Sequence, residues 1–558
     1  MSNKLELTWV GKGEQHTIEP RLLIENPSLS FSSHPNGLLS NCTYDNLLIH
    51  GDNLLALRAL ENAYSNKIKC IFIDPPFNTG AAFEHYDDNK EHSIWLDLMY
   101  RRITSFYKLL KDDGVLLIEI DDNEMPYLRV ILDEVFGRSK FVAQINVKSN
   151  NLSGNKTAHK EKTILRNKDN IIVYKKSDNL TVYPQYVERT RWDTHYNLFI
   201  TFKNGEILEI RKLKDVLVEK GLIEPKETVK EDILKNKEFY DFILKYRNNI
   251  SRYVNSMPAE IKARSKANPD EVIKYLDENG QTRFAHNGNR ISFLSSSIMS
   301  IDGKEKFVQL LGDLWVDIDF QNTQNEGGVS FPNSKKPEAL IRRVLEMLTL
   351  PGDLVLDSFL GSGTTCAVAH KMGRKWIGIE MGDHAYTHCK VRLDRVIKNE
   401  DKNGITSLVN WTGGGGYKFY ELAPTLINKD ELEEPIINKF YNPDMLAAAV
   451  ALHEGFNYQP DSSLFWKQSK SNEASYLFVT TKHVDINLLR TIKNTMADDE
   501  FLVIACKSFD NECKEFSKQI VIKKIPQMLL GKCEYDKNDY SLNIINPPIY
   551  DEEEEEDE

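Results

Sequence analysis

Short apolar runs alternate with amphipathic stretches along residues 45–185, a pattern typical of strands separated by helices. The pattern predicts strands at 47–49, 68–73, 115–120, 141–147 and 170–174, and helices at 54–64, 93–110 and 125–136. Helices of ten or more residues between apolar strands indicate crossover connections. This part of the chain therefore predicts an α/β fold with a doubly wound, mostly parallel sheet.

The alternation stops at about 186 and returns near Lys336. The stretch 186–325 is polar, with helices predicted near 227–247 and 258–266, and is interpreted as a module inserted into the α/β unit. The pattern resumes with a helix at 337–348, a strand at 354–357, a helix ending near 372 and a strand at 376–380. The predicted domains are an irregular arm at 1–44, two halves of one α/β domain at 45–185 and 326–412, the insert at 186–325, a smaller C-terminal α/β domain at 413–550 and a disordered acidic tail at 551–558.

Length and composition fit several globular domains, because 558 residues exceed what one core organises. No run of about 18 apolar residues is present, and the first residues lack a basic start followed by an apolar stretch. Seven cysteines occur without a CxxC pair, which favours reduced thiols over a zinc ribbon. We expect a cytoplasmic protein without a membrane span. His384, His388 and Cys389 lack further ligands nearby, so we expect no metal site.

Charge is unevenly distributed. The net charge is −12, and the tail 551–558 supplies eight of those negative charges. Between Arg138 and Arg191 the chain has 12 Lys and Arg against 4 Asp and Glu. Such a basic stretch is compatible with phosphate contacts, although a solvated surface loop explains the charge equally well. Lys148, Lys156, Arg189 and Arg191 of this stretch are the candidate phosphate contacts of a nucleic acid, with Trp192 beside the two arginines.

A glycine-containing turn, Asp357 to Gly363, is placed where a predicted strand passes into a helix. Glycines there let the backbone approach a ligand closely. Glu380 ends the next strand, where a carboxylate can accept hydrogen bonds from both ribose hydroxyls of an adenosine. No lysine follows Gly363, as a P-loop requires, and Cys366 occupies the position of the third glycine of a dinucleotide fingerprint. Of the cofactors bound by such a turn, S-adenosylmethionine remains. The residues of the turn alone are also compatible with a tight turn that binds no ligand.

A second motif, Asp74-Pro75-Pro76-Phe77, follows the predicted strand at 68–73. The prolines have no N–H, so the turn presents acceptors, the Asp74 carboxylate and the Pro75 carbonyl, beside a flat aromatic ring. This set suits a planar base that bears an exocyclic NH2 group and stacks on Phe77. Engaging both N–H bonds leaves the nitrogen lone pair free to attack an electrophilic methyl group. A base within a duplex would have to flip out to reach the turn.

These motifs carry a family resemblance. Asp74 to Phe77 resembles the DPP[YF] catalytic motif of amino-group DNA methyltransferases, and Asp357 to Gly363 resembles their FxGxG cofactor motif. Phe331 with Lys335-Lys336-Pro337 resembles the segment that precedes the cofactor motif. The catalytic motif comes first, as in the circularly permuted β class of these enzymes. The stretches GDNLLALRALENAYSNKIKCIFIDPPFNTG and GGGGYKFYEL are similar to the modification subunit of type III restriction–modification systems, and the resemblance covers about 40 to 420.

The resemblance implies a sheet of the class I S-adenosylmethionine-dependent methyltransferase type, in which Gly361 and Phe77 face one another across a cleft. It implies a target-recognition domain in the insert. The implied catalytic residues are Asp74, Pro75, Pro76 and Phe77. The implied cofactor-binding residues are Asp52, Phe331, Asp357, Phe359, Gly361, Gly363, Thr364 and Glu380, with Asp52 at the adenine and Phe331 at the methionine end.

The function expected from motifs and resemblance together is methyl transfer from S-adenosylmethionine to adenine N6 in double-stranded DNA. Methylation of cytosine N4 is the close alternative, because that amine poses the same chemical problem; in the family, DPP leans to adenine. A third hypothesis is a DNA-recognition and assembly subunit with little activity alone. The family likeness favours a homodimer and an ATP-dependent restriction subunit as partners.

Overall fold

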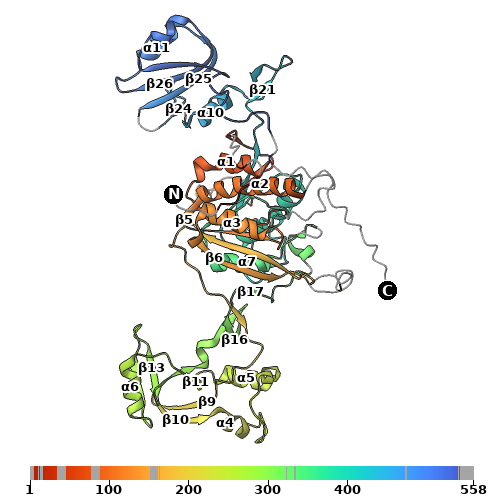
Figure 1. The fold of residues 1–558 in the computed structure, drawn as a ribbon, viewed down its shortest axis with the longest axis vertical. Coiled ribbons are helices and arrows are strands. Elements are labelled where there is room, and N and C mark those ends of the chain that lie inside the picture. The colour runs from red at the N-terminus through yellow and green to blue at the C-terminus, as the bar shows by residue number, and fades with distance from the viewer. Residues whose placement is uncertain are drawn as a thin grey trace. The chain divides into compact units, whose positions relative to one another are not determined.

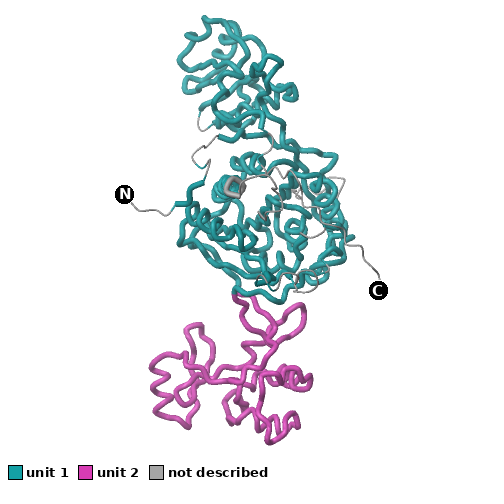
Figure 2. Tube along the Cα trace, turned by 45° about the vertical axis from the view of Figure 1, so that its right-hand side comes forward, with its two compact units in different colours: residues 1–183, 313–558 teal, residues 184–312 magenta. Residues whose placement is uncertain are grey.

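The computed structural model describes residues 6–9, 12, 17–33, 45–76, 88–150, 161, 164–321, 323–331, 335–471, 474–537 and 540. Phe77, Lys156 and the acidic tail at 551–558 lie outside the described residues. The chain forms two compact units, one of residues 1–183 with 313–558 and one of residues 184–312 (Figures 1 and 2). No helix among the described residues is both long and apolar enough to cross a membrane.

The first unit is built on an eleven-stranded sheet with the order β1-β20-β3-β19-β18-β4-β5-β7-β6-β17, and β2 pairs with β20. The strands are β1 (Leu23–Glu25), β2 (Phe31–Ser32), β3 (Leu47–His50), β4 (Ile68–Ile73), β5 (Leu110–Ile120), β6 (Phe141–Lys148), β7 (Lys168–Lys175), β17 (Leu314–Trp315), β18 (Leu354–Asp357), β19 (Lys375–Glu380) and β20 (Gly416–Leu422). The six adjacent strands from β20 to β5 run parallel to one another, whereas β7 is antiparallel to both β5 and β6. The sheet is therefore mixed, with a parallel centre.

The central pair of strands, β18 and β4, comes from distant parts of the chain. Val355 pairs with Cys70 and Leu356 with Ile71 in parallel register. From β4 the chain continues to β5 on one side, and from β18 it continues to β19 on the other side. The direction of winding thus reverses between these two strands, and ligands of open α/β sheets bind outside the carboxyl ends of strands at such a point.

Both faces of the central strands are covered. All six residues of β4 are buried, which a strand can achieve only when neighbouring elements pack on both faces. Helices α1 (Asn53–Tyr64), α2 (Asp88–Leu109) and α3 (Met125–Phe136) pack together and bury their apolar side chains with those of the sheet (Figure 1). Helices α7 (Glu338–Leu348), α8 (Thr364–Lys371) and α9 (Val391–Ile397) form a second group.

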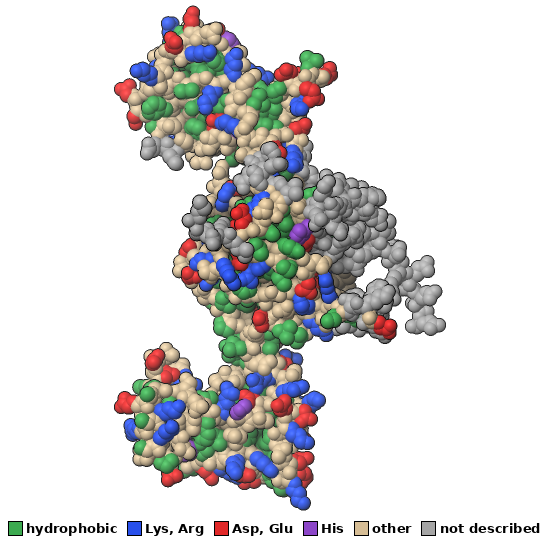
Figure 3. Space-filling model, viewed as in Figure 1, with side chains coloured by type: hydrophobic (Ala, Val, Ile, Leu, Met, Phe, Trp, Pro, Cys, Tyr) green, Lys and Arg blue, Asp and Glu red, His purple; other side chains and the backbone are tan. Residues whose placement is uncertain are grey.

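The unit of residues 184–312 is mostly antiparallel sheet. One sheet has the order β10-β9-β11-β14-β13-β12, and a smaller one has the order β15-β16-β8. The elements are β8 (Tyr186–Glu188), β9 (Leu198–Lys203), β10 (Glu206–Lys212), α4 (Leu213–Glu219), α5 (Lys237–Lys245), β11 (Ile250–Val254), α6 (Ala259–Ala267), β12 (Val272–Leu276), β13 (Thr282–His286), β14 (Asn289–Phe293), β15 (Ile298–Ile301) and β16 (Lys304–Leu310). Basic and acidic side chains are interspersed on the face of this unit that Figure 3 draws.

The C-terminal part of the first unit adds a five-stranded sheet with the order β23-β24-β25-β26-β27. Its three longest strands run parallel, as expected from strands joined through helical connections. The elements are β21 (Ile427–Lys429), β22 (Pro435–Ile437), α10 (Pro443–Glu454), β23 (Asn457–Tyr458), β24 (Ser469–Lys470), β25 (Ser475–Val484), α11 (Ile486–Lys493), β26 (Phe501–Phe509) and β27 (Ile520–Lys524).

The structure differs from the sequence prediction mainly in the insert. The helix predicted at 227–247 is a short 3₁₀ segment at Glu231–Lys235 followed by α5. The strands of this unit were missed, because antiparallel strands that are covered on one face only carry many polar residues. The compact unit ends at Gly312, not near 325. The following residues belong to the first unit, where β17 pairs with β6.

A buried ionic network holds α7, α8 and α9 together. The Glu338 carboxylate accepts hydrogen bonds from Lys371 Nζ at 2.7 and 2.9 Å and from Arg392 Nη2 at 2.8 Å. Asp401 Oδ2 accepts a further bond from Lys371 at 2.6 Å. These four side chains are at most 1% exposed. Buried charges are tolerated when they are paired and hydrogen-bonded, and here two cations meet two carboxylates.

We predict that Glu338→Ala lowers the free energy of unfolding by about 3–5 kcal/mol, because it leaves two buried cations without their shared partner. Urea unfolding followed by the fluorescence of the tryptophans measures the change. The control is Glu346→Ala on the same helix, where the carboxylate is 39% exposed and pairs with Arg342; its effect should stay below about 1 kcal/mol. Equal midpoints for the two variants would contradict the prediction.

Candidate active site

A pocket lies at the carboxyl ends of β4 and β18, where the winding of the sheet reverses. Its volume is about 130 Å³, and its lining includes the Asp74 side chain and the glycine turn at Gly361. The other lining residues are Phe72, Phe331, Lys336, Asp357, Phe359, Leu360, Ser362, Thr364 and Thr365. Two motifs 283 residues apart in the sequence, one at Asp74 and one at Asp357, therefore share one pocket.

The Asp74-Pro75-Pro76 turn is fixed from one side by a buried indole. Trp95 is 0% exposed, and its Nε1 donates a hydrogen bond to the Pro76 carbonyl at 3.0 Å. The Pro75 carbonyl accepts no hydrogen bond from any described residue, and Asp74 Oδ1 is buried without a described donor. The Pro75 carbonyl and Asp74 Oδ1 therefore have no hydrogen-bond donor within the described part of the chain. Buried acceptors are usually hydrogen-bonded, so these two favour the binding of a donor group.

The second Asp74 oxygen is paired with a lysine. Lys336 Nζ lies 3.2 Å from Asp74 Oδ2 and donates a hydrogen bond to Glu119 Oε1 at 2.8 Å. Burial raises the pKa of Asp74 to about 6, although Lys336 opposes the rise. Burial likewise raises the pKa of Glu119 to about 7. The site therefore contains two carboxyl groups whose protonation changes close to neutral pH.

The glycine turn depends on backbone conformations that favour glycine. Gly361 has φ +55° and Gly363 has φ +80°, both in the left-handed region. Gly363 precedes the first residue of α8, so the chain turns there from strand to helix. A Cβ atom at Gly363 would also lie 3.3 Å from the Cα atom of Cys389. The turn therefore brings bare backbone to the wall of the pocket.

Glu380, at the end of β19, is fixed by two backbone groups. Its Oε2 accepts a hydrogen bond from Gly361 N at 2.7 Å and its Oε1 accepts one from Gly382 N at 3.0 Å. Each carboxylate oxygen has two lone pairs, so both oxygens keep one acceptor position. Asp357, at the end of β18, accepts from Phe359 N at 2.9 Å and hydrogen-bonds the Thr365 side chain, and burial raises its pKa to about 7.

Phe331 lies against the glycine turn. A Cβ atom at Gly361 would be 3.7 Å from the Phe331 ring, and the ring centroid is 5.0 Å from that of His384. Lys335 closes the loop that carries Phe331, because its Nζ donates hydrogen bonds to three carbonyls between residues 324 and 329. Phe331 is thereby placed by a lysine that the sequence had marked only as part of a motif.

Two other predicted cofactor residues are engaged within the protein. Asp52 is 3% exposed and caps α1, with its Oδ1 accepting from Leu54 N at 2.8 Å and Leu55 N at 3.1 Å. Its Oδ2 accepts from Tyr540 N at 2.9 Å, and Asp52 lies outside the pocket lining. Thr364 lines the pocket, and its hydroxyl accepts a hydrogen bond from Arg392 Nη1 at 2.7 Å.

The predicted DNA contacts have different environments. Lys148 is exposed at the end of β6. In the unit of residues 184–312, Arg189 and Arg191 line a surface hollow of about 520 Å³ together with His195 and Arg252. Trp192 was grouped with these arginines, but it is 2% exposed and packs edge-on against Phe239, so its ring belongs to the core.

Sequence reasoning missed the charged groups beneath the pocket. Glu119 lies in the apolar run of β5 and is 0% exposed. A carboxylate within an apolar strand is rarely buried without a partner, so the sequence did contain a signal that Glu119 has a specific role. Asp121 contributes to the start of α3, because its Oδ1 accepts a hydrogen bond from Asn123 N at 3.1 Å. Among the described residues, no group of three or more His, Cys, Asp or Glu side chains is arranged to hold a metal ion.

Comparison with known proteins gives consistent results. A family described as DNA methylase matches residues 68–390. The chain is 36% identical over 416 residues to the "Probable type III restriction-modification enzyme HindVI Mod subunit" of Haemophilus influenzae, which covers 68% of this chain and 54% of that protein. It is 25% identical over 507 residues to the type III restriction-modification enzyme EcoP15I Mod subunit of Escherichia coli, which covers 79% of this chain and 74% of that protein.

Among solved structures, the PvuII DNA methyltransferase (cytosine-N4-specific) is 16% identical with a TM-score of 0.33, over 66% of this chain and 94% of that one. The chain spans about half the length of its Haemophilus relative. The family match covers more than half of the chain and includes both the turn at Asp74 and the glycine turn at Gly361. The chain therefore belongs to the DNA methylase family.

Proposed function

We propose that the protein is a DNA methyltransferase that transfers a methyl group from S-adenosylmethionine to N6 of adenine. The observation that carries the proposal is the shared pocket: the acceptor turn after β4 and the glycine turn after β18 line one cavity. The glycine turn suits a cofactor and the Asp74 turn suits an amine. The two binding sites are adjacent because their strands are hydrogen-bonded neighbours.

The residues around the glycine turn fit S-adenosylmethionine. Glu380 keeps acceptor positions for ribose hydroxyls, and the positive φ of Gly361 exposes backbone beside it. Phe331 adds an apolar wall. The described cavity of about 130 Å³ is smaller than the roughly 300–1,000 Å³ of typical ligand sites, so it accommodates part of the cofactor. When bound, S-adenosylmethionine supplies a methyl group that is electrophilic because it is attached to a sulfonium.

The Asp74 turn fits a primary amine on an aromatic ring. The carboxylate of Asp74 and the carbonyl of Pro75 each accept one amine hydrogen, which localises the lone pair on nitrogen. Trp95 holds the turn through the Pro76 carbonyl, so the two acceptors keep their geometry. We assign stacking on the base to Phe77. A duplex base has to flip out to reach this turn.

The relatives' names support a place in a type III restriction–modification system. The matches to type III Mod subunits cover 68% and 79% of this chain. We therefore propose that the protein is cytoplasmic and that its substrate is double-stranded DNA. We assign target recognition to residues 184–312. We further propose that the protein forms a homodimer and assembles with an ATP-dependent restriction subunit. The chain order, with β4 before β18, supports a circularly permuted arrangement of the sheet.

We predict that the purified protein incorporates tritiated methyl groups from S-adenosylmethionine into plasmid DNA. Mass spectrometry of the digested nucleosides should show N6-methyladenine. N4-methylcytosine as the product would overturn the choice of base. DNA binding without any incorporation would favour a recognition and assembly subunit over an enzyme.

The matched variant for this experiment is Asp74→Asn, which keeps the shape but replaces an acceptor oxygen with a donor. Methyl transfer should fall by roughly 10²- to 10⁴-fold, the usual contribution of a positioned catalytic group. Binding of S-adenosylmethionine should persist. Asp178→Asn, at a carboxylate that is 75% exposed, should leave the rate unchanged. A near-normal rate for Asp74→Asn would refute the proposed mechanism.

A second prediction concerns the cofactor. Glu380→Ala should weaken binding of S-adenosylmethionine by roughly 10- to 100-fold, because it removes the proposed ribose acceptors and releases Gly361 N–H from its partner. Isothermal titration calorimetry measures the affinity, and the exposed-site variant Glu346→Ala serves as the control. Unchanged affinity in Glu380→Ala would exclude Glu380 from the cofactor site.

A further inference from the structure

Three side chains from three separate segments meet at the pocket, and two of them line it. Asp74 follows β4, Glu119 lies in β5 and Lys336 precedes α7. The Lys336 ammonium contacts Asp74 Oδ2 at 3.2 Å and Glu119 Oε1 at 2.8 Å. Lys336 is 15% exposed, Asp74 is 23% exposed and Glu119 is 0% exposed, so the contact with Glu119 is the better shielded from water. Charges in such a place interact more strongly than on the surface.

A glutamate is unexpected at the buried position that Glu119 occupies in β5. A buried carboxylate loses hydration, and replacement of buried ionic groups by apolar residues is often neutral or stabilising. Its Oε2 also makes no hydrogen bond with any described residue. A residue chosen for packing alone would be apolar, like its neighbours Ile118 and Ile120. The charge of Glu119 therefore needs a reason other than the stability of β5.

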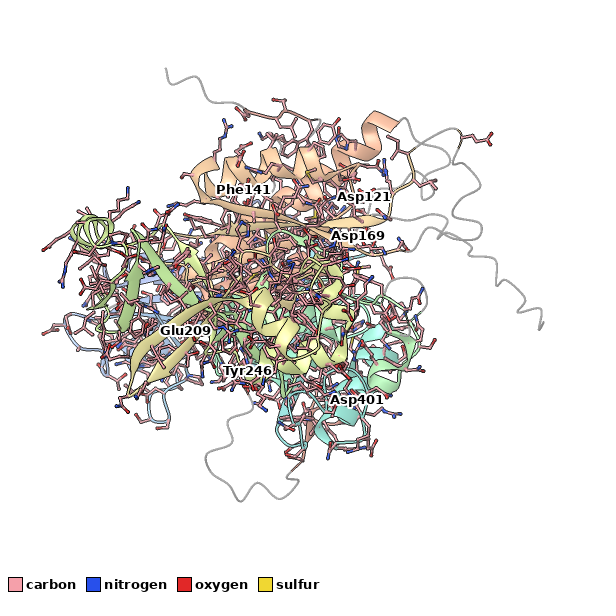
Figure 4. All side chains as sticks on the ribbon, turned by 90° about the horizontal axis from the view of Figure 1, so that it is seen from below. Asp121, Phe141, Asp169, Glu209, Tyr246 and Asp401 are labelled. Atoms are coloured by element: carbon pink, nitrogen blue, oxygen red, sulfur yellow. The ribbon has the colours of Figure 1, made fainter. Side chains whose placement is uncertain are left out.

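Further carboxylates face the same cluster from adjoining strands. Asp169, the second residue of β7, precedes Asn170, which pairs with Ile120 of β5. Asp121, which Figure 4 labels together with Asp169, directly follows Ile120 at this end of the sheet. Asp357, at the end of β18, faces Asp74 from the other side. One lysine thus contacts two carboxylates, Asp74 and Glu119, and Asp169 and Asp357 add negative charge to the same site.

This excess of negative charge affects protonation in a definite direction. Burial and the neighbouring carboxylates raise the pKa values of Asp74 and Glu119, while Lys336 lowers them. Burial lowers the pKa of Lys336, but Asp74, Glu119 and Asp169 outweigh burial and raise it, so Lys336 stays a cation. Lys336 therefore favours the ionised form of Asp74, and Glu119 reduces that effect by sharing the cation.

We infer that Lys336 is a positioning residue that keeps Asp74 ionised for the amine, and that Glu119 sets how strongly it does so. This inference rests on the proposed function. In the proposed reaction the amine nitrogen forms a bond to the methyl carbon while the carbon–sulfur pair stays on sulfur. The nitrogen then loses one proton to the Asp74 carboxylate, which passes it to solvent. Only ionised Asp74 can accept both the hydrogen bond and the proton.

The inference predicts opposite shifts for two variants. Asp74 acts as the carboxylate, so methyl transfer should fall as the pH drops through its pKa. Lys336→Met removes the cation and should move this acid limb to higher pH by about 1–3 units. Glu119→Gln keeps the side-chain volume and removes a negative charge, so that Asp74 is the remaining carboxylate in contact with Lys336. The acid limb of the pH–rate profile should therefore move to lower pH by about one unit. A purely structural role for the two residues would produce no such opposite shifts.

The matched control is Lys69→Met. Lys69 is also a nearly buried lysine paired with a carboxylate, Asp113 at 2.9 Å, but it lies at the start of β4, away from the pocket. This variant tests the loss of a buried lysine as such, and its acid limb should coincide with that of the unchanged protein. Shifts in the same direction for Lys336→Met and Glu119→Gln, or no shift in either, would overturn the inference.

A second measurement does not need activity. Infrared titration of the carboxyl stretch, with Asp74→Asn used to assign the Asp74 band, reports the pKa directly. It should rise in Lys336→Met and fall in Glu119→Gln. If the unchanged protein transfers no methyl group while these shifts occur, the proposed function fails and the charge coupling stands. If the protein is active and the Asp74 band does not move in Glu119→Gln, the inference fails alone.

Discussion

The parallel pairing of β4 with β18 is the interaction on which the site depends. Two residue pairs, Val355 with Cys70 and Leu356 with Ile71, align the ends of two strands that are far apart in the chain. Because the strands are parallel and end at the same edge, Asp74 and Asp357 reach the same side of the sheet. The winding of the sheet reverses there, and a point of reversal is where open α/β sheets form a crevice for ligands.

This pairing also explains why the motifs tolerate an unusual order along the chain. A parallel neighbour can be supplied by any segment that reaches the sheet, provided that its connection is long enough. The segments that form the two halves of the sheet are separated by the 184–312 unit, yet β18 is inserted between β4 and β19 without a break in the ladder. Chain order and spatial order are therefore independent here.

Sequence reasoning succeeded where the local pattern decides the structure. The apolar run at 68–73 and the glycines at 361 and 363 each indicated a strand or a turn, and the structure has β4 and two positive φ angles at those places. It failed where tertiary contacts decide. The indole of Trp192 is buried by Phe239, a residue 47 positions later, and nothing local distinguishes it from an exposed aromatic ring. The partners of Glu119 and Lys336 were unpredictable for the same reason, since each lies on a different element.

The two buried ionic clusters of the first unit differ in their balance. Around Glu338, two cations meet two carboxylates and the side-chain hydrogen bonds are largely satisfied, which suits a rigid support for the glycine turn through Arg392 and Thr364. Around Lys336, one cation meets an excess of carboxylates, and oxygens of Asp74 and Glu119 remain without described donors. A polar cluster whose hydrogen bonds are all made is rigid. In a cluster with an excess of carboxylates, the protonation of each group instead depends on the charges around it.

The 184–312 unit contributes no strand to the main sheet, since its two sheets are separate from it. On either side of this unit the chain is anchored to the first unit by backbone hydrogen bonds, from Tyr183 N to the Met347 carbonyl and from Asn146 N to the Asp313 carbonyl. Another domain could be exchanged between these anchors without disturbing a single pairing in the main sheet. The architecture thus lets this unit be replaced while the pairing that aligns Asp74 with Asp357 is inherited unchanged.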